Sequence, residues 1–317
     1  MQHLTLSSRL EQSLRAGQDS FAQQFVDPAM AAAWYSGLQG AEVHFAGSTA
    51  LSVRVRYPGD RRAGVDHLQL ELSETGRIAR LTSERNLPVW ALGPVTRTPA
   101  AHGTVLSSGI SSVQQKAWAS RLDRASATVR TSAVLGSNSA WDGGLVVIVP
   151  ASANDFAALS GTDAADTGAV ATCASGTPRI VINPKSFAVG EQWLQTTLVH
   201  EAVHVATDSP CSTGTAWVIE GVAESVSARS DLATASSNKD LVRSYLRAHG
   251  VPAGLPQQVE SSTDYALAQV AIDQVRAQLG HQEAADFIAR GVAGQLSEAE
   301  VTQATEWYRA EMTRRAG

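Results

Sequence analysis

Two histidines four residues apart, His200 and His204, constrain this chain more than any other feature of its sequence. Four residues of an α-helix turn through roughly 400°, so both imidazoles lie on the same face of a helix. There they can bind one zinc ion, with Glu201 beside them as a candidate general base. The flanking side chains are apolar, and histidines buried in such a helix need polar partners. The spacing therefore predicts a metal-binding helix rather than a histidine pair satisfied within a core.

A third ligand is expected from the next apolar segment, where Glu220 follows His204 by sixteen residues. Zinc in catalytic sites typically takes three protein ligands and a water molecule, and both imidazole and carboxylate suit it. One Zn²⁺ ion held by His200, His204 and Glu220 is therefore the predicted cofactor. Glu224, one helical turn further on, is either an acceptor that orients a ligating histidine or a surface carboxylate. Asp208 has a similar pair of interpretations, with a loop or helix-capping role favoured.

The chain before residue 99 begins with a helical pattern and continues with strand patterns. Residues 4–33 are rich in Ala, Gln and Leu at helical spacing. Apolar and polar side chains then alternate with the period of a strand in four stretches, at residues 42–45, 50–57, 67–72 and 76–81. A helix packed on a curved antiparallel sheet is the economical arrangement for this order. A small α+β domain is therefore predicted for residues 1–98.

The stretch from Gly93 to Gly103 has the composition of a linker, so the domain boundary is placed after residue 98. In the second domain, residues 99–317, a helix is expected at 112–130, and strands are expected at 103–106, 145–150, 169–172 and 179–184. From Glu191 onward the pattern is helical with interruptions. The whole chain is thus predicted to be α+β.

The composition excludes several classes of protein. A net charge of −5 gives no reason to expect a nucleic-acid partner, because nucleic-acid binders are usually basic. The hydrophobic fraction of 44% and charged fraction of 17% are those of a globular protein. No apolar run approaches the roughly 20 residues of a membrane helix, so no transmembrane segment is expected. The sequence does not indicate an oligomeric state.

The amino terminus and the two cysteines bear on the cellular compartment. The first residues lack the basic start and apolar core of a signal peptide, which taken literally indicates a cytoplasmic protein. A chain from which an export signal or membrane anchor had been removed would look the same. Cys173 and Cys211 lie on either side of the predicted metal-binding helix. They either form one disulfide, as in an oxidising compartment, or are two unrelated buried thiols.

The pattern His-Glu-x-x-His at residues 200–204, followed by Trp-x-x-Glu-Gly-x-Ala at 217–223, resembles the gluzincin metallopeptidases. In this zincin group the third zinc ligand is a glutamate on a following helix. The resemblance covers roughly residues 104–317 and is specific only between residues 179 and 228. It implies a zincin-like domain with a mixed sheet, the HExxH helix and a C-terminal helical subdomain. It also implies hydrolysis of a peptide or protein substrate, with Glu201 as general base to a metal-activated water.

The resemblance assigns two further roles. In the family, the strand before the HExxH helix forms the sheet edge along which an extended substrate lies, and residues 179–183 occupy that place here. The helical subdomain supplies an acid that stabilises the tetrahedral intermediate, for which Tyr265 fits best. His281, and then Tyr245 or His249, are the next candidates. For Tyr265 an aromatic core or capping role is the alternative.

The whole arrangement is also similar to secreted or membrane-anchored actinobacterial proteins. These pair a small N-terminal domain of the cystatin or nuclear-transport-factor-2 type with a gluzincin-like peptidase domain. The similarity would make residues 1–98 the first of these domains and residues 99–317 the second. It implies an extracytoplasmic location, an export signal removed from this chain, and a disulfide between Cys173 and Cys211.

A catalytically inactive binding or regulatory protein with the same fold is the main alternative function. Its N-terminal domain would hold a ligand or partner in a pocket lined by five aromatic residues, Trp34, Tyr35, His44, Phe45 and Tyr57. Such aromatics more often fill a core. The three expected ligands and Glu201 are all present, which favours an enzyme. A zinc hydrolase with a non-peptide substrate would share the same site chemistry.

Overall fold

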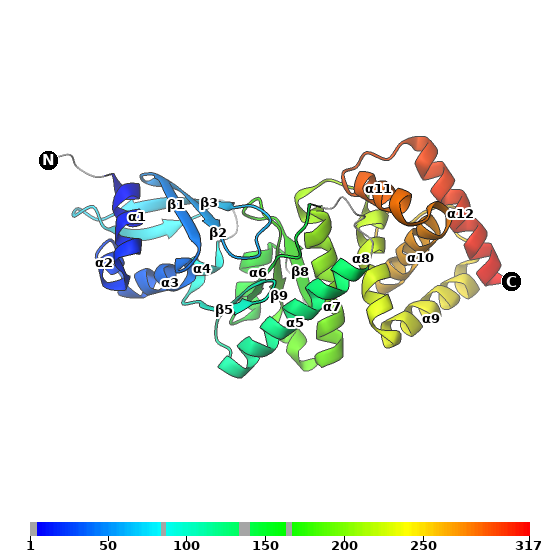
Figure 1. The fold of residues 1–317 in the computed structure, drawn as a ribbon, viewed down its shortest axis with the longest axis horizontal. Coiled ribbons are helices and arrows are strands. Elements are labelled where there is room, and N and C mark those ends of the chain that lie inside the picture. The colour runs from blue at the N-terminus through cyan, green and yellow to red at the C-terminus, as the bar shows by residue number, and fades with distance from the viewer. Residues whose placement is uncertain (1–4, 84–86, 133–139, 163–166) are drawn as a thin grey trace. The chain divides into compact units, whose positions relative to one another are not determined.

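The computed structural model describes residues 5–83, 87–132, 140–162 and 167–317, and the α+β prediction is confirmed (Figure 1). The helices are α1 Leu6–Ala16, α2 Gln18–Ala22, α3 Pro28–Leu38, α4 Val89–Leu92, α5 Ser112–Thr131, α6 Ala153–Ser160, α7 Glu191–Thr207, α8 Ala216–Ser230, α9 Leu232–His249, α10 Ser262–Leu279, α11 His281–Val292 and α12 Glu298–Ala316. The strands are β1 Glu42–Gly47, β2 Ala50–Arg56, β3 Gly64–Leu72, β4 Ile78–Thr82, β5 Thr96–Ala100, β6 Gly103–Ser107, β7 Leu145–Val149, β8 Ala169–Thr172 and β9 Arg179–Ile182. Two short 3₁₀ turns, η1 Pro184–Ala188 and η2 Ser209–Cys211, flank α7.

The chain forms two compact units that do not follow the sequence in two simple blocks. Unit 1 comprises residues 1–123 and 144–188, and unit 2 comprises residues 124–143 and 189–317. The hydrophobic core of unit 1 includes side chains from both of its sheets. The predicted boundary after residue 98 falls inside β5, and it stays a prediction. No helix in the described ranges has the length and hydropathy needed to cross a membrane.

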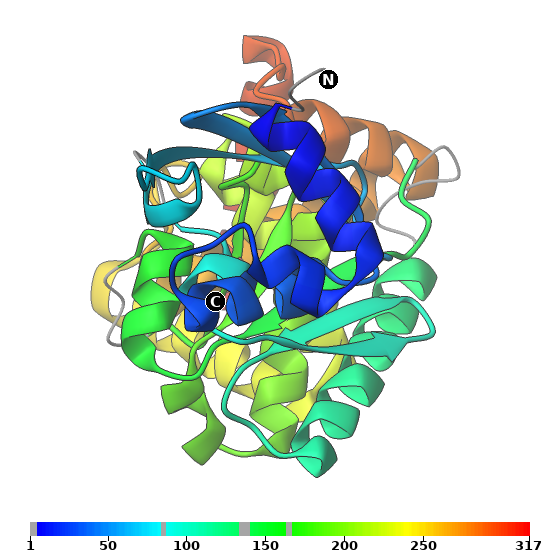
Figure 2. The same ribbon diagram turned by 90° about the vertical axis from the view of Figure 1, so that its left-hand side faces the viewer.

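The first sheet of unit 1 is the antiparallel one that the alternating patterns predicted. Its strand order is β1-β2-β3-β4, and α1, α2 and α3 lie against it, as Figure 2 shows from the N-terminal side. The predicted single helix over residues 4–33 is three helices, because Gly17 ends α1 at a φ of 114° and Asp27 caps α3. Residue 4 lies outside the described residues. The aromatics proposed for a ligand pocket mostly fill the core instead: Trp34, Phe45 and Tyr57 are buried, Tyr35 is partly buried against the same core, and His44 is exposed.

The second sheet of unit 1 is mixed, with strand order β5-β6-β7-β9-β8. The three central strands run parallel and are fully buried, while β5 and β8 are antiparallel edge strands. Two expectations are wrong here. The linker-like segment 93–103 contains β5, which pairs along its length with β6. The segment 179–183 is not a sheet edge, because β8 folds back onto β9 and takes the edge position.

Unit 2 is helical, and its central helices pack at very short range. Gly221 on α8 lies so close to α10 that a Cβ atom there would come within 2.5 Å of the carbonyl oxygen of Ala268. The side chain of Ile272 is almost as near, at 2.8 Å from the same position. The absence of a side chain at Gly221 therefore sets the distance between α8 and α10, and both helices carry candidate site residues.

Gly221→Ala is therefore expected to destabilise the protein. Alanine would gain at most about 1 kcal/mol in helix propensity. Overpacking against a backbone atom costs about 1–3 kcal/mol, and the backbone of α10 cannot yield as a flexible side chain can. Chemical denaturation of the two proteins measures the difference. Gly254→Ala is the matched control, since no atom lies within 4 Å of a Cβ at that position. Equal stability of Gly221→Ala and wild type would contradict the prediction.

Candidate metal centre

Helix α7 places the two predicted histidines as their spacing required. It spans Glu191–Thr207, and most of its residues from Leu194 to Ala206 are buried. The rings of His200 and His204 stack edge to face, with centroids 4.9 Å apart. Asp208 follows the last residue of α7 as its C-cap and adopts a left-handed conformation with a φ of 61°. The capping role favoured for Asp208 is thus the one that its backbone performs.

A single carboxylate oxygen of Glu220, on α8, contacts both histidines. This Oε2 atom lies 3.2 Å from His200 Nε2 and 3.3 Å from His204 Nε2. One potential ligand atom from each of the three residues lies within 4.8 Å of the other two. Two atoms bound to one tetrahedral zinc at 2.0–2.1 Å are roughly 3.4 Å apart. Two imidazole nitrogens and a carboxylate oxygen at these separations therefore fit a zinc ion, and the three predicted ligands are brought together.

The second nitrogen of each histidine also has a polar partner. His200 Nδ1 lies 3.3 Å from Glu224 Oε2, and His204 Nδ1 lies 3.1 Å from Ser209 Oγ. With Nδ1 protonated and donating to these oxygens, each Nε2 is left as a neutral lone pair directed at the shared position. Glu224 thus has the orienting geometry suggested as one of its two interpretations. Ser209 was not predicted.

Glu224 is itself held in place by residues from two other helices. Asn238 of α9 donates from Nδ2 to Glu224 Oε1 at 2.6 Å and to Gln269 Oε1 of α10 at 2.8 Å. Asn238 is buried. Because its amide bonds both Glu224 of α8 and Gln269 of α10, it connects three helices. Sequence reasoning missed Asn238 and Gln269, because neither lies in a motif or at a recognisable spacing from the histidines. The network fixes the carboxylate that orients His200.

The charges of the cluster are strongly coupled. Burial opposes a charged imidazole, but hydrogen bonds to Glu220 and Glu224 outweigh it and hold the pKa of His200 well above its usual value. Burial likewise opposes ionised Glu220, but His204 and His200 together bring its pKa well below the ordinary range. Without a metal, the site thus holds an ionised Glu220 next to positive charge on the histidines, and a zinc ion would replace that positive charge because imidazole binds metal in its neutral form.

Two further predicted residues lie beside the cluster. Glu201 is buried in α7 immediately after His200, with only 8% of its surface exposed. Tyr265, in the first turn of α10, stacks edge to face on His200 with ring centroids 5.8 Å apart. Burial and the charges of Glu220, Glu201 and Glu224 raise the pKa of Tyr265, so its hydroxyl remains a hydrogen-bond donor at all ordinary pH values.

The three alternatives to Tyr265 as the residue that stabilises the tetrahedral intermediate do not lie against the predicted zinc ligands in the same way. Tyr245 and His249 stack on each other in the last turns of α9, with ring centroids 4.9 Å apart. His281 is exposed at the start of α11. Of these four candidates, Tyr265 is the one whose ring packs against a predicted zinc ligand.

Both cysteines are disulfide-bonded, and since the chain has two, the bond joins Cys173 to Cys211. Cys211 is the last residue of η2, the turn that begins with Ser209. The disulfide is thus attached to the turn whose hydroxyl contacts His204. Disulfides of this kind persist in oxidising compartments.

No family model matches the chain, and neither does the sequence of any curated protein. Among solved structures, the chain is similar to an M1 zinc metallopeptidase from Deinococcus radiodurans, with 13% sequence identity and a TM-score of 0.35. The similarity covers 87% of this chain and 59% of that protein, so the chain spans less than two thirds of its length. A likeness at this level does not define a family, and the functional assignment rests on the site itself.

Removing either of the oxygens that contact the histidine Nδ1 atoms, Glu224 Oε2 or Ser209 Oγ, should weaken zinc binding without abolishing it. We expect Glu224→Gln and Ser209→Ala each to weaken zinc affinity by about 10–100-fold, the usual cost of losing a partner that orients a ligating histidine. Competition with a chromogenic zinc chelator measures the affinities. Ser212→Ala is the control for Ser209→Ala, because the Ser212 hydroxyl bonds a backbone carbonyl in the same turn. Unchanged affinity in both variants would show that the two oxygens do not orient the ligands.

Proposed function

We propose that the protein is a zinc-dependent metallopeptidase with one Zn²⁺ ion held by His200, His204 and Glu220. The observation that carries the proposal is the convergence of two Nε2 atoms on one Glu220 oxygen at 3.2 and 3.3 Å. The orientation of each opposite ring nitrogen by Glu224 or Ser209 supports it.

Zinc bound there would lower the pKa of a water molecule toward neutrality and polarise a peptide carbonyl. Glu201 would take the proton from the attacking water and pass it to the departing amide nitrogen. The buried position of Glu201 beside His200 supports this role. Tyr265 would donate its hydroxyl hydrogen to the oxygen that becomes negative in the tetrahedral intermediate. Its raised pKa supports this part, because the hydroxyl stays protonated.

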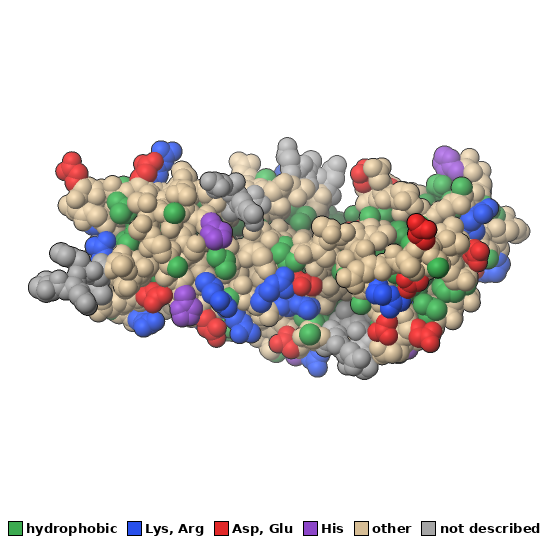
Figure 3. Space-filling model, turned by 90° about the horizontal axis from the view of Figure 1, so that it is seen from above, with side chains coloured by type: hydrophobic (Ala, Val, Ile, Leu, Met, Phe, Trp, Pro, Cys, Tyr) green, Lys and Arg blue, Asp and Glu red, His purple; other side chains and the backbone are tan. Residues whose placement is uncertain are grey.

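We further propose that the protein works outside the cytoplasm on a peptide or protein substrate. The disulfide between Cys173 and Cys211 supports the location. The mixed charge distribution supports a substrate other than nucleic acid, since acidic and basic side chains are interspersed on the face seen in Figure 3.

Metal content and peptide cleavage, measured on the same preparation, test the function. We expect about one zinc per chain by elemental analysis, and cleavage of a peptide library that stops on chelation and returns when zinc is added back. Zinc binding without cleavage of any library member would favour the inactive binding protein or a hydrolase of another substrate. A protein that binds no zinc would refute the metal centre.

A further inference from the structure

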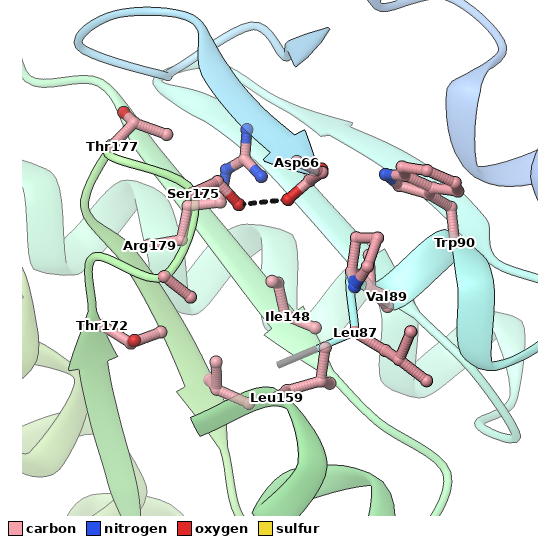
Figure 4. A pocket seen from close by; sticks show the side chains of 13 residues that line it. Asp66, Leu87, Val89, Trp90, Ile148, Leu159, Thr172, Ser175, Thr177 and Arg179 are labelled. Atoms are coloured by element: carbon pink, nitrogen blue, oxygen red, sulfur yellow. Dashed lines mark hydrogen bonds between the residues drawn. The ribbon is translucent and has the colours of Figure 1, made fainter. Parts of the chain in front are cut away.

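Unit 1 contains a small cavity between its two sheets, shown in Figure 4. The connection between β8 and β9 forms one wall and is attached to β3 by a hydrogen bond from Val65 N to Ser175 O at 2.8 Å. Apolar side chains form much of the remaining lining: Leu87, Val89, Ile148, Leu159 and Val181. The polar lining consists of Asp66, Trp90, Thr172, Ser175, Thr177 and Arg179. The cavity is therefore amphipathic, with a distinct polar side.

Three buried polar atoms on this side have no hydrogen-bond partner within the described part of the chain. They are Asp66 Oδ2, Trp90 Nε1 and Thr177 Oγ1. Asp66 is 8% exposed, Trp90 0% and Thr177 1%. The indole nitrogen of Trp90 points toward Asp66 in Figure 4 and acts to lower the pKa of that carboxyl, but it forms no hydrogen bond of ordinary geometry with it. A buried polar group without a partner costs about 1–3 kcal/mol, so three in one cavity indicate that something fills it.

The charges around the cavity determine what can fill it. Arg179 is already paired with Asp60, through hydrogen bonds of 2.9 and 2.7 Å. Ser175 Oγ donates to Asp66 Oδ1 at 2.6 Å, which leaves Oδ2 as an acceptor. Burial raises the pKa of Asp66, although Arg179 opposes the shift. The unfilled positions thus comprise a carboxylate oxygen that needs a donor and an indole N–H that needs an acceptor.

We propose that this cavity binds a small neutral carboxamide. The amide N–H donates to Asp66 Oδ2, the amide oxygen accepts from Trp90 Nε1 or Thr177 Oγ1, and the carbon attached to the amide lies on the apolar lining. An anion would face Asp66 without a donor, and a cation would face the Trp90 N–H without an acceptor. The cavity volume is about 30 Å³. Since one water needs roughly 10–15 Å³, the space suits a head group of about three non-hydrogen atoms.

Three molecules of almost the same shape test the proposal: acetamide, acetate and acetamidinium. Acetamide both donates and accepts, acetate can only accept, and acetamidinium can only donate. In ¹H–¹⁵N spectra of the full chain, acetamide is expected to shift one of the seven indole N–H signals saturably. Acetate and acetamidinium are expected to leave it unchanged. Absence of a saturable shift means that the cavity holds only water, and equal binding of either ion refutes the neutral carboxamide.

Variants of the polar side identify the cavity as the binding site. Thr177→Val keeps the side-chain shape and removes a hydroxyl that bonds no described residue, so it is expected to fold at least as well as wild type. It should weaken acetamide binding about fivefold, as the loss of one hydrogen bond implies. Asp66→Asn provides a second test, and Thr82→Val on the exposed side of β4 is the control. Unchanged affinity in both cavity variants would overturn the assignment. Zinc content should be the same in every variant.

Discussion

Replacing Glu201 with glutamine is expected to abolish peptide hydrolysis while leaving zinc bound. Glutamine has almost the same shape as glutamate, but its amide cannot accept the proton of the attacking water. General-base catalysis contributes about 10²–10⁴-fold to rate, so turnover should fall by that factor. Glu201 is not one of the three residues whose ligand atoms converge, which are His200, His204 and Glu220. The zinc content of Glu201→Gln should therefore stay at the wild-type value. Peptide cleavage and elemental analysis of the same preparations measure both quantities.

Glu191→Gln is the matched control, because the same substitution is made in the same helix at an exposed position. It should retain full activity. Hydrolysis by Glu201→Gln at the wild-type rate would remove Glu201 from the mechanism. Loss of zinc together with activity would instead show that Glu201 supports the metal site. The two failures are distinguishable because zinc is measured independently of turnover.

The arrangement of the candidate metal ligands was largely predictable because these residues are close together in sequence. His200 and His204 share a helix face through the geometry of a single helix, and Glu220 and Glu224 do so on α8. The apolar residues around both motifs require that the two helices be buried, which favours their packing together. Such reasoning needs only helix periodicity and the ligand preferences of zinc.

The supporting residues could not be predicted, because their positions depend on long-range packing. Ser209 contacts His204 only because Asp208 turns the chain in a left-handed conformation after α7. A positive φ at an aspartate is not encoded by any spacing. Asn238 and Gln269 come from α9 and α10, and nothing in either helix marks its approach to Glu224.

The prediction that residues 179–183 form a sheet edge was wrong for a related reason. The pattern at residues 179–183 correctly predicts a strand, but position within a sheet is decided by which strands pair with it. Here β8 pairs antiparallel with β9 along the edge of β9 that β7 leaves unpaired, so β8 is the edge strand. The threonines and prolines around residues 93–103 likewise suggested a linker, although β5 lies there and pairs with β6. The alternation of apolar and polar residues can locate a strand in the sequence. Neither this alternation nor the composition specifies which strands pair with each other.

Zinc should stabilise the protein in proportion to its affinity, and Glu220→Gln should remove most of that effect. A ligand present at a thousand times its dissociation constant stabilises the folded state by about 4 kcal/mol. Glu220 supplies the only carboxylate among the three converging ligands, so its loss should weaken zinc binding by more than the roughly 100-fold upper limit expected for Glu224→Gln. At the same zinc concentration the stabilisation would fall to about 1.4 kcal/mol or less.

Chemical denaturation with zinc and with chelator, for both proteins, measures this difference. Comparing each protein with its own chelated form separates the metal effect from any change in packing caused by the substitution. Glu260→Gln, an exposed position before α10, is the control and should keep the full wild-type zinc effect. If Glu220→Gln retained that effect as well, a different third group would hold the ion, and the convergence on Glu220 Oε2 would describe only the metal-free hydrogen bonds. Loss of the zinc effect in Glu220→Gln but not in Glu260→Gln would establish the Glu220 carboxylate as the third ligand. The comparison with the chelated protein removes any effect of packing, and the comparison with Glu260→Gln removes the effect of losing one negative charge.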